Sequence, residues 1–330
     1  MQELLNFSVH PGDIGRFDDD WSAVADYVHG HGLDGIELLI GDAAPPAMPP
    51  GMTVAVHLPF WVSWLTIWQG HSPPPWSDLE RYLSGGRNAE ELVLNLRQSW
   101  LHAAHLQPAY MVFHVCHVEL AHAFTRAYTY TSADVCRAAA DLLNATAATF
   151  PNGEPPVRVF LENLWWPGLT FTDAEATDAL VERLTWNNWA FVLDTGHLMN
   201  THSALFDESE AVAYVLAQIE QLPSAIRQRI EGVHLHTSLS GAYQQQAQQQ
   251  GLPDQFAQRS RAQQYGLVHE HVTHIDQHQP FTTTGCADIV AALCPHFITH
   301  EFIGTDTEHC NASIRTQRAV LHANKEQTNQ

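Results

Sequence analysis

Residues 191–197 read FVLDTGH, and the interpretation of the whole chain starts from this stretch. A short apolar run ends at Asp194, and an imidazole follows at His197 after a turn that contains Gly196. This order is typical of a buried strand whose C-terminal end carries two metal ligands. The stretch therefore predicts a strand followed by a metal-binding turn.

The same construction recurs along the chain, because other apolar runs also close on a side chain that can bind a metal. These runs are VAVH (54–57), MVFH (111–114), VFLE (159–162), VHLH (233–236) and FITHE (297–301). Their nearly continuous apolar interiors are typical of parallel strands that are buried on both faces. The recurrence predicts strand ends that bring ligand-type side chains to one place.

The order of the expected elements predicts the fold class. Strands are expected at 4–10, 35–40, 52–60, 109–118, 157–162, 190–194, 232–237 and 297–302. Helices are expected at 18–31, 88–106, 131–150, 173–184, 207–230, 286–293 and 311–323. Strands that alternate with helices favour a (β/α)8 TIM barrel, an α/β fold, with one domain over residues 1–330. The alternative, a doubly wound open sheet, would bring fewer strand ends together.

Two segments interrupt this alternation. Residues 61–90 are expected to form a long loop that carries Trp61, Trp64, Trp68 and Trp76. Residues 239–275 form an insertion after the seventh strand and include a glutamine-rich run at 243–250. Long loops in compact domains are usually functional or disordered, so the insertion is a lid over the site, an oligomer contact or a segment without a catalytic role.

The charge of the chain limits its partners. Lys and Arg total 15 against 36 Asp and Glu, which gives a formal net charge of −21. Nucleic acids and anionic membranes are bound chiefly through cationic contacts to phosphates, so both are unexpected partners. A small-molecule substrate is expected instead.

Cysteine usage and the N-terminal residues indicate the compartment. The 5 cysteines are odd in number and form no C-x-x-C pair, so neither a disulfide framework nor a zinc ribbon is expected. The first residues lack a basic region followed by a long apolar run, and no stretch approaches the roughly 18 apolar residues of a membrane span. The expectation is a cytoplasmic protein.

Together with HIDQH at 274–278, the chain resembles the xylose isomerase-like superfamily of TIM barrels. This superfamily includes the endonuclease IV family of apurinic endonucleases (AP endonuclease family 2) and many sugar isomerases and epimerases. The resemblance covers nearly the whole chain. It implies that the site lies at the C-terminal ends of the barrel strands.

In endonuclease IV, three zinc ions are held by nine residues, and each of them has a counterpart of matching type here. By resemblance, Glu162 is the bridging glutamate of strand five, Asp194 and His197 form the D-x-x-H of strand six, and Glu301 is the final glutamate. The complete implied ligand set is His57, His114, Glu162, Asp194, His197, His234, Asp276, His278 and Glu301.

These residue types suit Zn, Mn or Fe, and their number implies two or three divalent ions per chain. Clustered ions make hydroxide at neutral pH and stabilise charge on a phosphoryl group. The expected activity is therefore hydrolysis of a phosphoester in a small, sugar-phosphate-like substrate by metal-bound hydroxide.

Other functions stay open at this point. In the epimerases of the superfamily, a single ion is held by residues that correspond to Glu162, Asp194, His234 and Glu301. There Glu162 and Glu301 would also be the catalytic acid and base. An iron-dependent oxidative enzyme and a non-catalytic metal or sugar binder are the further alternatives.

Overall fold

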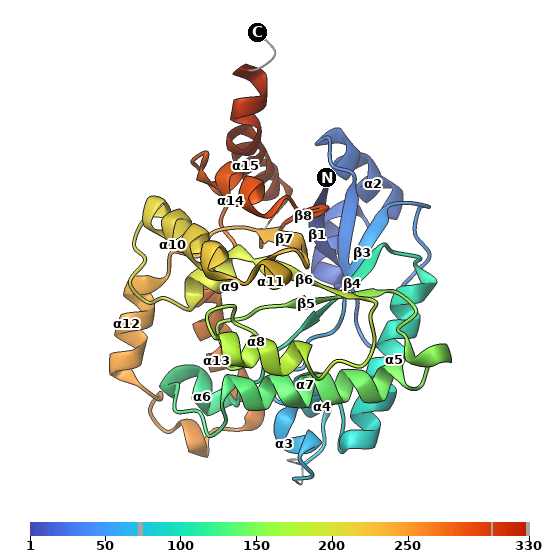
Figure 1. Ribbon diagram of the computed structural model, residues 1–330, viewed down its shortest axis with the longest axis vertical. Coiled ribbons are helices and arrows are strands. Elements are labelled where there is room, and N and C mark those ends of the chain that lie inside the picture. The colour runs from blue at the N-terminus through green and yellow to red at the C-terminus, as the bar shows by residue number, and fades with distance from the viewer. Residues whose placement is uncertain (72–74, 305, 328–330) are drawn as a thin grey trace.

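The structure is a computed structural model that describes residues 1–71, 75–304 and 306–327. Its centre is a closed barrel in which parallel strands follow one another from β1 to β8 (Figure 1). The strands are β1 (Gln2–Ser8), β2 (Gly35–Leu39), β3 (Thr53–His57), β4 (Tyr110–His114), β5 (Arg158–Glu162), β6 (Trp189–Asp194), β7 (Ile230–Leu235) and β8 (Phe297–His300). Pairing of β1 with β8 closes the ring, so the predicted TIM barrel is confirmed and the open sheet is excluded.

Helices surround the barrel (Figure 1). The longer ones are α2 (Trp21–Gly30), α5 (Ala89–His105), α7 (Ser132–Ala147), α8 (Ala174–Val181), α10 (Glu208–Gln221), α14 (Gly285–Leu293) and α15 (Thr307–Gln327). The shorter ones are α1 (Pro11–Ile14), α3 (Leu65–Trp68), α4 (Asp78–Ser84), α6 (Leu120–Thr125), α9 (Thr195–Asn200) and α11 (Ser224–Arg227). Single 3-10 turns are η1 (Gly15–Phe17) and η2 (Pro151–Gly153).

Local sequence explains where these elements begin. The Asn88 side chain accepts a hydrogen bond from the Glu91 amide at the start of α5, and Thr131 forms a capping box with Asp134 at the start of α7. Such caps satisfy amides that have no partner within the helix. The barrel interior is filled by residues that include Leu4, Ala55, Tyr110, Val112, Phe160, Ala190 and Val192. Packing thus fills the barrel below the strand ends and leaves those ends for the site.

The segment 61–90 is more ordered than the predicted loop. It contains the short helices α3 and α4, while residues 72–74 of the expected loop lie outside the described residues. Trp64 is buried, and its indole Nε1 donates a hydrogen bond of 2.8 Å to the Cys116 carbonyl. The sequence did not predict these helices because the tryptophans pack against other elements and give no clear helical period.

The insertion after β7 is helical and packs against α6. It consists of α12 (Gly241–Gln250), a 3-10 turn η3 (Phe256–Gln258) and α13 (Arg261–Ile275), which lie beside α6 in Figure 1. Gln244 accepts a hydrogen bond from Arg126, and the His271 ring lies 3.1 Å through Nε2 from the Ala123 carbonyl oxygen. The glutamine-rich run is therefore a helix with specific tertiary contacts.

Two sequence expectations concern thiols and membrane spans. All 5 cysteines lie in the described part of the chain, and each is a free thiol, as expected. Among the described residues, no helix combines the length and the apolar character that crossing a membrane requires.

Candidate metal centre

The register of the parallel barrel aligns the ends of its strands. His114 on β4 pairs with Glu162 on β5, and Asp194 on β6 pairs with His234 on β7. Because the strands are parallel, their C-terminal ends meet at one face of the barrel. All nine residues that the sequence predicted as ligands belong to adjacent groups at this face, and within each group the candidate ligand atoms lie within 4.8 Å of one another.

The first group consists of His57, His114 and Glu162. His114 Nε2 lies 2.9 Å from Glu162 Oε2, and His57 Nε2 lies 3.3 Å from the same oxygen and 3.0 Å from His114 Nε2. His57 Nδ1 donates a hydrogen bond of 2.8 Å to the Leu58 carbonyl oxygen. The lone pair of His57 Nε2 is therefore free and faces the other two residues of the group. Three donor atoms therefore converge on one point.

The second group consists of Glu162, Asp194, His234 and Glu301. His234 Nδ1 lies 3.1 Å from Glu162 Oε1, 3.1 Å from Glu301 Oε2 and 3.7 Å from Asp194 Oδ2. Glu162 thus presents Oε2 to the first group and Oε1 to the second. A carboxylate divided in this way can bridge two ions.

The third group consists of His197, Asp276 and His278. Asp276 Oδ2 lies 3.2 Å from His197 Nε2 and 2.8 Å from His278 Nε2. The orientation of the His197 ring is fixed through its other nitrogen, because Nδ1 lies 2.9 Å from the Asn163 carbonyl oxygen. Asp276 follows α13 directly, so the insertion ends at the site.

A local turn explains why Asp194 and His197 are three residues apart. Asp194 ends β6 and caps α9, accepting a hydrogen bond of 2.6 Å from the His197 amide through Oδ1. Gly196 lies in the first turn of α9, where an added Cβ would overlap the ring of His236. The turn therefore requires glycine and delivers both side chains to the same face.

The titration of these side chains follows from their mutual proximity. Burial favours neutral imidazoles, but the carboxylates of Glu37, Glu162 and Glu301 outweigh it and raise the pKa of His234 well above its ordinary value. In the same way Asp276 outweighs burial and raises the pKa of His278 to about 9. Burial would raise the pKa of the Glu162 carboxyl, but His114 and His234 hold that pKa well below its usual range. The protonated rings of His234 and His278 therefore lie beside ionised carboxylates, whereas burial lowers the pKa of His114.

The donors fit divalent metal ions. Imidazole nitrogens and carboxylate oxygens are ligands for Zn, Mn and Fe, and the three groups supply them in sets of three or four. Two buried candidate ligand atoms at this face, His278 Nδ1 and Glu301 Oε2, lack a hydrogen-bond partner. Buried polar atoms are normally satisfied, so unpartnered donors gathered at one place agree with a metal centre.

Two further residues belong to the surroundings of the site. His236, which the sequence analysis did not select, approaches Asp194 Oδ2 to 3.0 Å through Nε2, and its ring stacks on His278 at 4.2 Å and 12°. His236 also forms a fourth group with His278 and Glu301, whose candidate ligand atoms lie within 4.8 Å of one another, so it is a further candidate ligand. Its position two residues after His234 was the available signal. The other residue is Glu37, which contacts His234 from inside the barrel.

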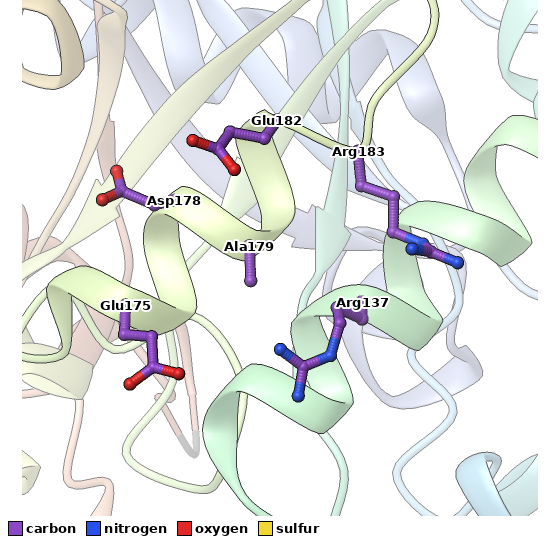
Figure 2. A pocket seen from close by; sticks show the side chains of 6 residues that line it. All are labelled: Arg137, Glu175, Asp178, Ala179, Glu182 and Arg183. Carbon is purple, nitrogen blue, oxygen red and sulfur yellow. The ribbon is translucent and has the colours of Figure 1, made fainter.

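A separate surface pocket lies on the helical layer. It is lined by Arg137, Glu175, Asp178, Ala179, Glu182 and Arg183 of α7, α8 and the residues that follow α8 (Figure 2). Its arginines already pair with carboxylates, since Arg137 contacts Asp134 at 2.8 Å and Arg183 contacts Asp141 at 2.5 Å. This pocket contains none of the nine candidate ligands and is not the candidate site.

Comparisons with known proteins show the fold. No family model matches the chain, and no curated protein matches it. Endonuclease IV from Thermus thermophilus is 15% identical with a TM-score of 0.53, over 98% of this chain and 100% of that chain. A D-tagatose 3-epimerase-like protein is 11% identical with a TM-score of 0.54, over 99% of this chain and 100% of that chain.

The IOLI protein, solved with a bound zinc atom, is 12% identical with a TM-score of 0.51, over 98% of this chain and 97% of that chain. At these identities the similarity concerns the fold. The chain therefore has the closed TIM-barrel fold that these structures share, and this fold is the one that the sequence predicted.

Proposed function

We propose that the protein is a metal-dependent enzyme of the xylose isomerase-like superfamily whose site holds two or three divalent ions. We further propose that it hydrolyses a phosphoester in a small, sugar-phosphate-like substrate. One observation carries the proposal: the two carboxylate oxygens of Glu162 face different ligand groups, Oε2 toward His57 and His114 and Oε1 toward His234. A bridging carboxylate with donors on both sides is what a multinuclear centre needs.

The residues that would hold the ions follow from the three groups. His57, His114 and Glu162 would hold one ion, and Glu162, Asp194, His234 and Glu301 a second. His197, Asp276 and His278 would hold a third. Ions in such a centre polarise a phosphoryl oxygen and lower the pKa of a water molecule, which is the chemistry that phosphoester hydrolysis requires.

The environment of Glu162 favours this function over epimerisation. An epimerase needs a glutamate with a free oxygen to remove a proton from a sugar carbon. Here Oε1 lies 3.3 Å from His197 Nδ1 and 3.1 Å from His234 Nδ1, and Oε2 has His57 and His114 as neighbours. Both oxygens are thus directed at imidazoles, which supports ligation as the role of Glu162.

A specific observation keeps the epimerase as the second candidate. The group Glu162, Asp194, His234 and Glu301 is complete by itself, with all donor atoms within 4.8 Å. It matches the single-ion set implied by the resemblance to epimerases. In that case His57 and His114 would be dispensable for activity.

The test compares two reactions in the same preparations. We expect the metal-reconstituted wild type to hydrolyse p-nitrophenyl phosphate or bis(p-nitrophenyl) phosphate. The rate of the variant His57→Ala/His114→Ala should be lower by at least about 100-fold, as expected for loss of metal-assisted catalysis. Glu231→Gln is the control, because Glu231 pairs with Arg158 away from the ligand groups. Deuterium exchange into a ketose that survives in the double variant would favour the epimerase instead. Cleavage of an abasic DNA duplex by the wild type would refute the small substrate.

A further inference from the structure

A buried carboxylate lies directly behind the candidate ligand His234. Glu37 is in the middle of β2 and only 3% exposed, and its Oε1 lies 2.9 Å from His234 Nε2. The opposite ring nitrogen, Nδ1, faces Glu162 and Glu301. His234 is therefore held between a carboxylate inside the barrel and the ligand group at the strand ends.

Other strands hold Glu37 in place. The Tyr110 hydroxyl on β4 donates a hydrogen bond of 2.8 Å to Glu37 Oε2, and the Thr299 hydroxyl on β8 donates one of 3.0 Å to the same oxygen. Both donors are buried. Since one carboxylate oxygen is occupied by the two hydroxyls, the other is left to His234.

This arrangement has no simple packing explanation. A buried carboxylate is costly unless it is paired, and an apolar side chain would fill the barrel interior at lower cost. His234 Nε2 has no partner of hydrogen-bond geometry, because Glu37 Oε1 is at the right distance but off the direction of the ring N–H. The contact is thus an ion pair at 2.9 Å.

We propose that Glu37 is a positioning residue for the metal centre: it accepts the Nε2–H of His234 and thereby presents Nδ1 as the ligating nitrogen. A carboxylate that accepts the second N–H of a ligating histidine fixes its tautomer and orientation and strengthens its donation to the metal. The inference rests on the proposed metal centre and adds to it a residue that touches no ion itself. It also explains why Tyr110 and Thr299 carry hydroxyls inside an otherwise apolar barrel.

The experiment measures metal affinity rather than activity. Zinc is titrated into the metal-free full-length chain against a competing chelator, for the wild type, Glu37→Gln and Glu3→Gln. Glutamine keeps the size of the side chain and a carbonyl acceptor but removes the charge. Glu3→Gln is the matched control, because Glu3 is also a buried glutamate that contacts two histidines, His300 and His322. Neither of these histidines is one of the nine candidate ligands.

We expect Glu37→Gln to weaken the binding of one zinc ion by about 10- to 100-fold, which is the range for loss of such a supporting carboxylate. The affinity for the other ions should fall by less than about threefold. The visible spectrum of the cobalt-substituted protein should change in Glu37→Gln and stay unchanged in Glu3→Gln. Thr299→Val removes one hydrogen bond to Glu37 but leaves the Glu37 carboxylate in place. It should therefore weaken the binding of the same zinc ion by a smaller factor.

Two results would overturn the inference, and they are distinguishable from failure of the proposed function. Equal affinities for all ions in the wild type and Glu37→Gln would refute the role of Glu37 while leaving the metal centre intact. A uniform loss shared by Glu3→Gln would reduce Glu37 to a general stabilising residue. A wild type that binds no ion at all would instead refute the proposed function.

Discussion

Glu162 is the residue on which the candidate site depends most. It is buried, and its oxygens lie between imidazoles that come from β3, β4, β7 and α9. A carboxylate can bridge two ions because each oxygen donates separately, whereas the amide nitrogen of glutamine does not bind metals. In the proposed centre, Glu162 is therefore the residue that would join two ions.

We predict that Glu162→Gln lowers the metal content by at least about one ion per chain, because loss of the bridge removes a donor from two sites at once. Elemental mass spectrometry of protein purified without chelator measures this directly. Glu231→Gln serves as the control. Metal content equal to that of the wild type would mean that Glu162 is not a ligand.

The histidines of the site predict how metal binding depends on pH. Burial would lower the pKa of His278, but Asp276 raises it to about 9, and the pKa values of His197 and His234 are also raised well above 6.5. Near pH 7 these rings carry protons in the metal-free protein, and an ion must displace them. Zinc affinity should therefore increase as pH rises from about 6.5 to about 9.

The same shift has a consequence for stability. A raised pKa in the folded state stabilises the protein fully below the unfolded value of 6.5, and this stabilisation is lost as pH rises toward about 9. The metal-free protein should lose stability over this interval.

The displacement of protons by zinc has its own test. Calorimetry in two buffers of different ionisation enthalpy would detect the proton release on zinc binding, and identical heats in both buffers would contradict that release.

At the scale of elements, a partly buried ion pair joins the insertion to α4 in the segment that follows β3. Arg261 Nε at the start of α13 lies 2.7 Å from Glu80 Oε1 on α4, and the Glu80 side chain is almost completely buried. Removing the arginine would leave this carboxylate unpaired. Arg261 itself is partly exposed, which moderates the cost.

We predict that Arg261→Ala lowers the free energy of unfolding by about 2 kcal/mol, below the range for a fully buried pair. The double variant Arg261→Met/Glu80→Gln should recover part of this loss, because it removes the unpaired charge. Urea unfolding followed by circular dichroism measures both. A single variant as stable as the wild type would show that the pair does not secure the insertion.

At the scale of the whole molecule, the sequence predicted the fold because the fold depends on local patterns, whereas the complete set of nine candidate ligands came from the resemblance to a known family. Apolar runs that close on His, Asp or Glu mark the C-terminal ends of buried strands, and the closed barrel brings those ends together. Glu37 was not selected, because it lies in mid-strand and its contacts come from β4, β7 and β8, far away in sequence.

The first helix of the insertion, α12, was missed for a different reason. The run at 243–250 has almost no apolar residues, so it lacks the helical period on which sequence interpretation depends. Its helix is stabilised instead by tertiary contacts, such as the 2.8 Å approach of the Tyr243 hydroxyl to His271 Nδ1 on α13.

The number of ions per chain tests the central claim most directly. Elemental mass spectrometry should find two or three ions in protein purified without chelator, and fewer in the variant His57→Ala/His114→Ala, which removes two donors of one group. A single ion per chain that is unchanged in this variant would contradict the multinuclear centre and make the epimerase the better account.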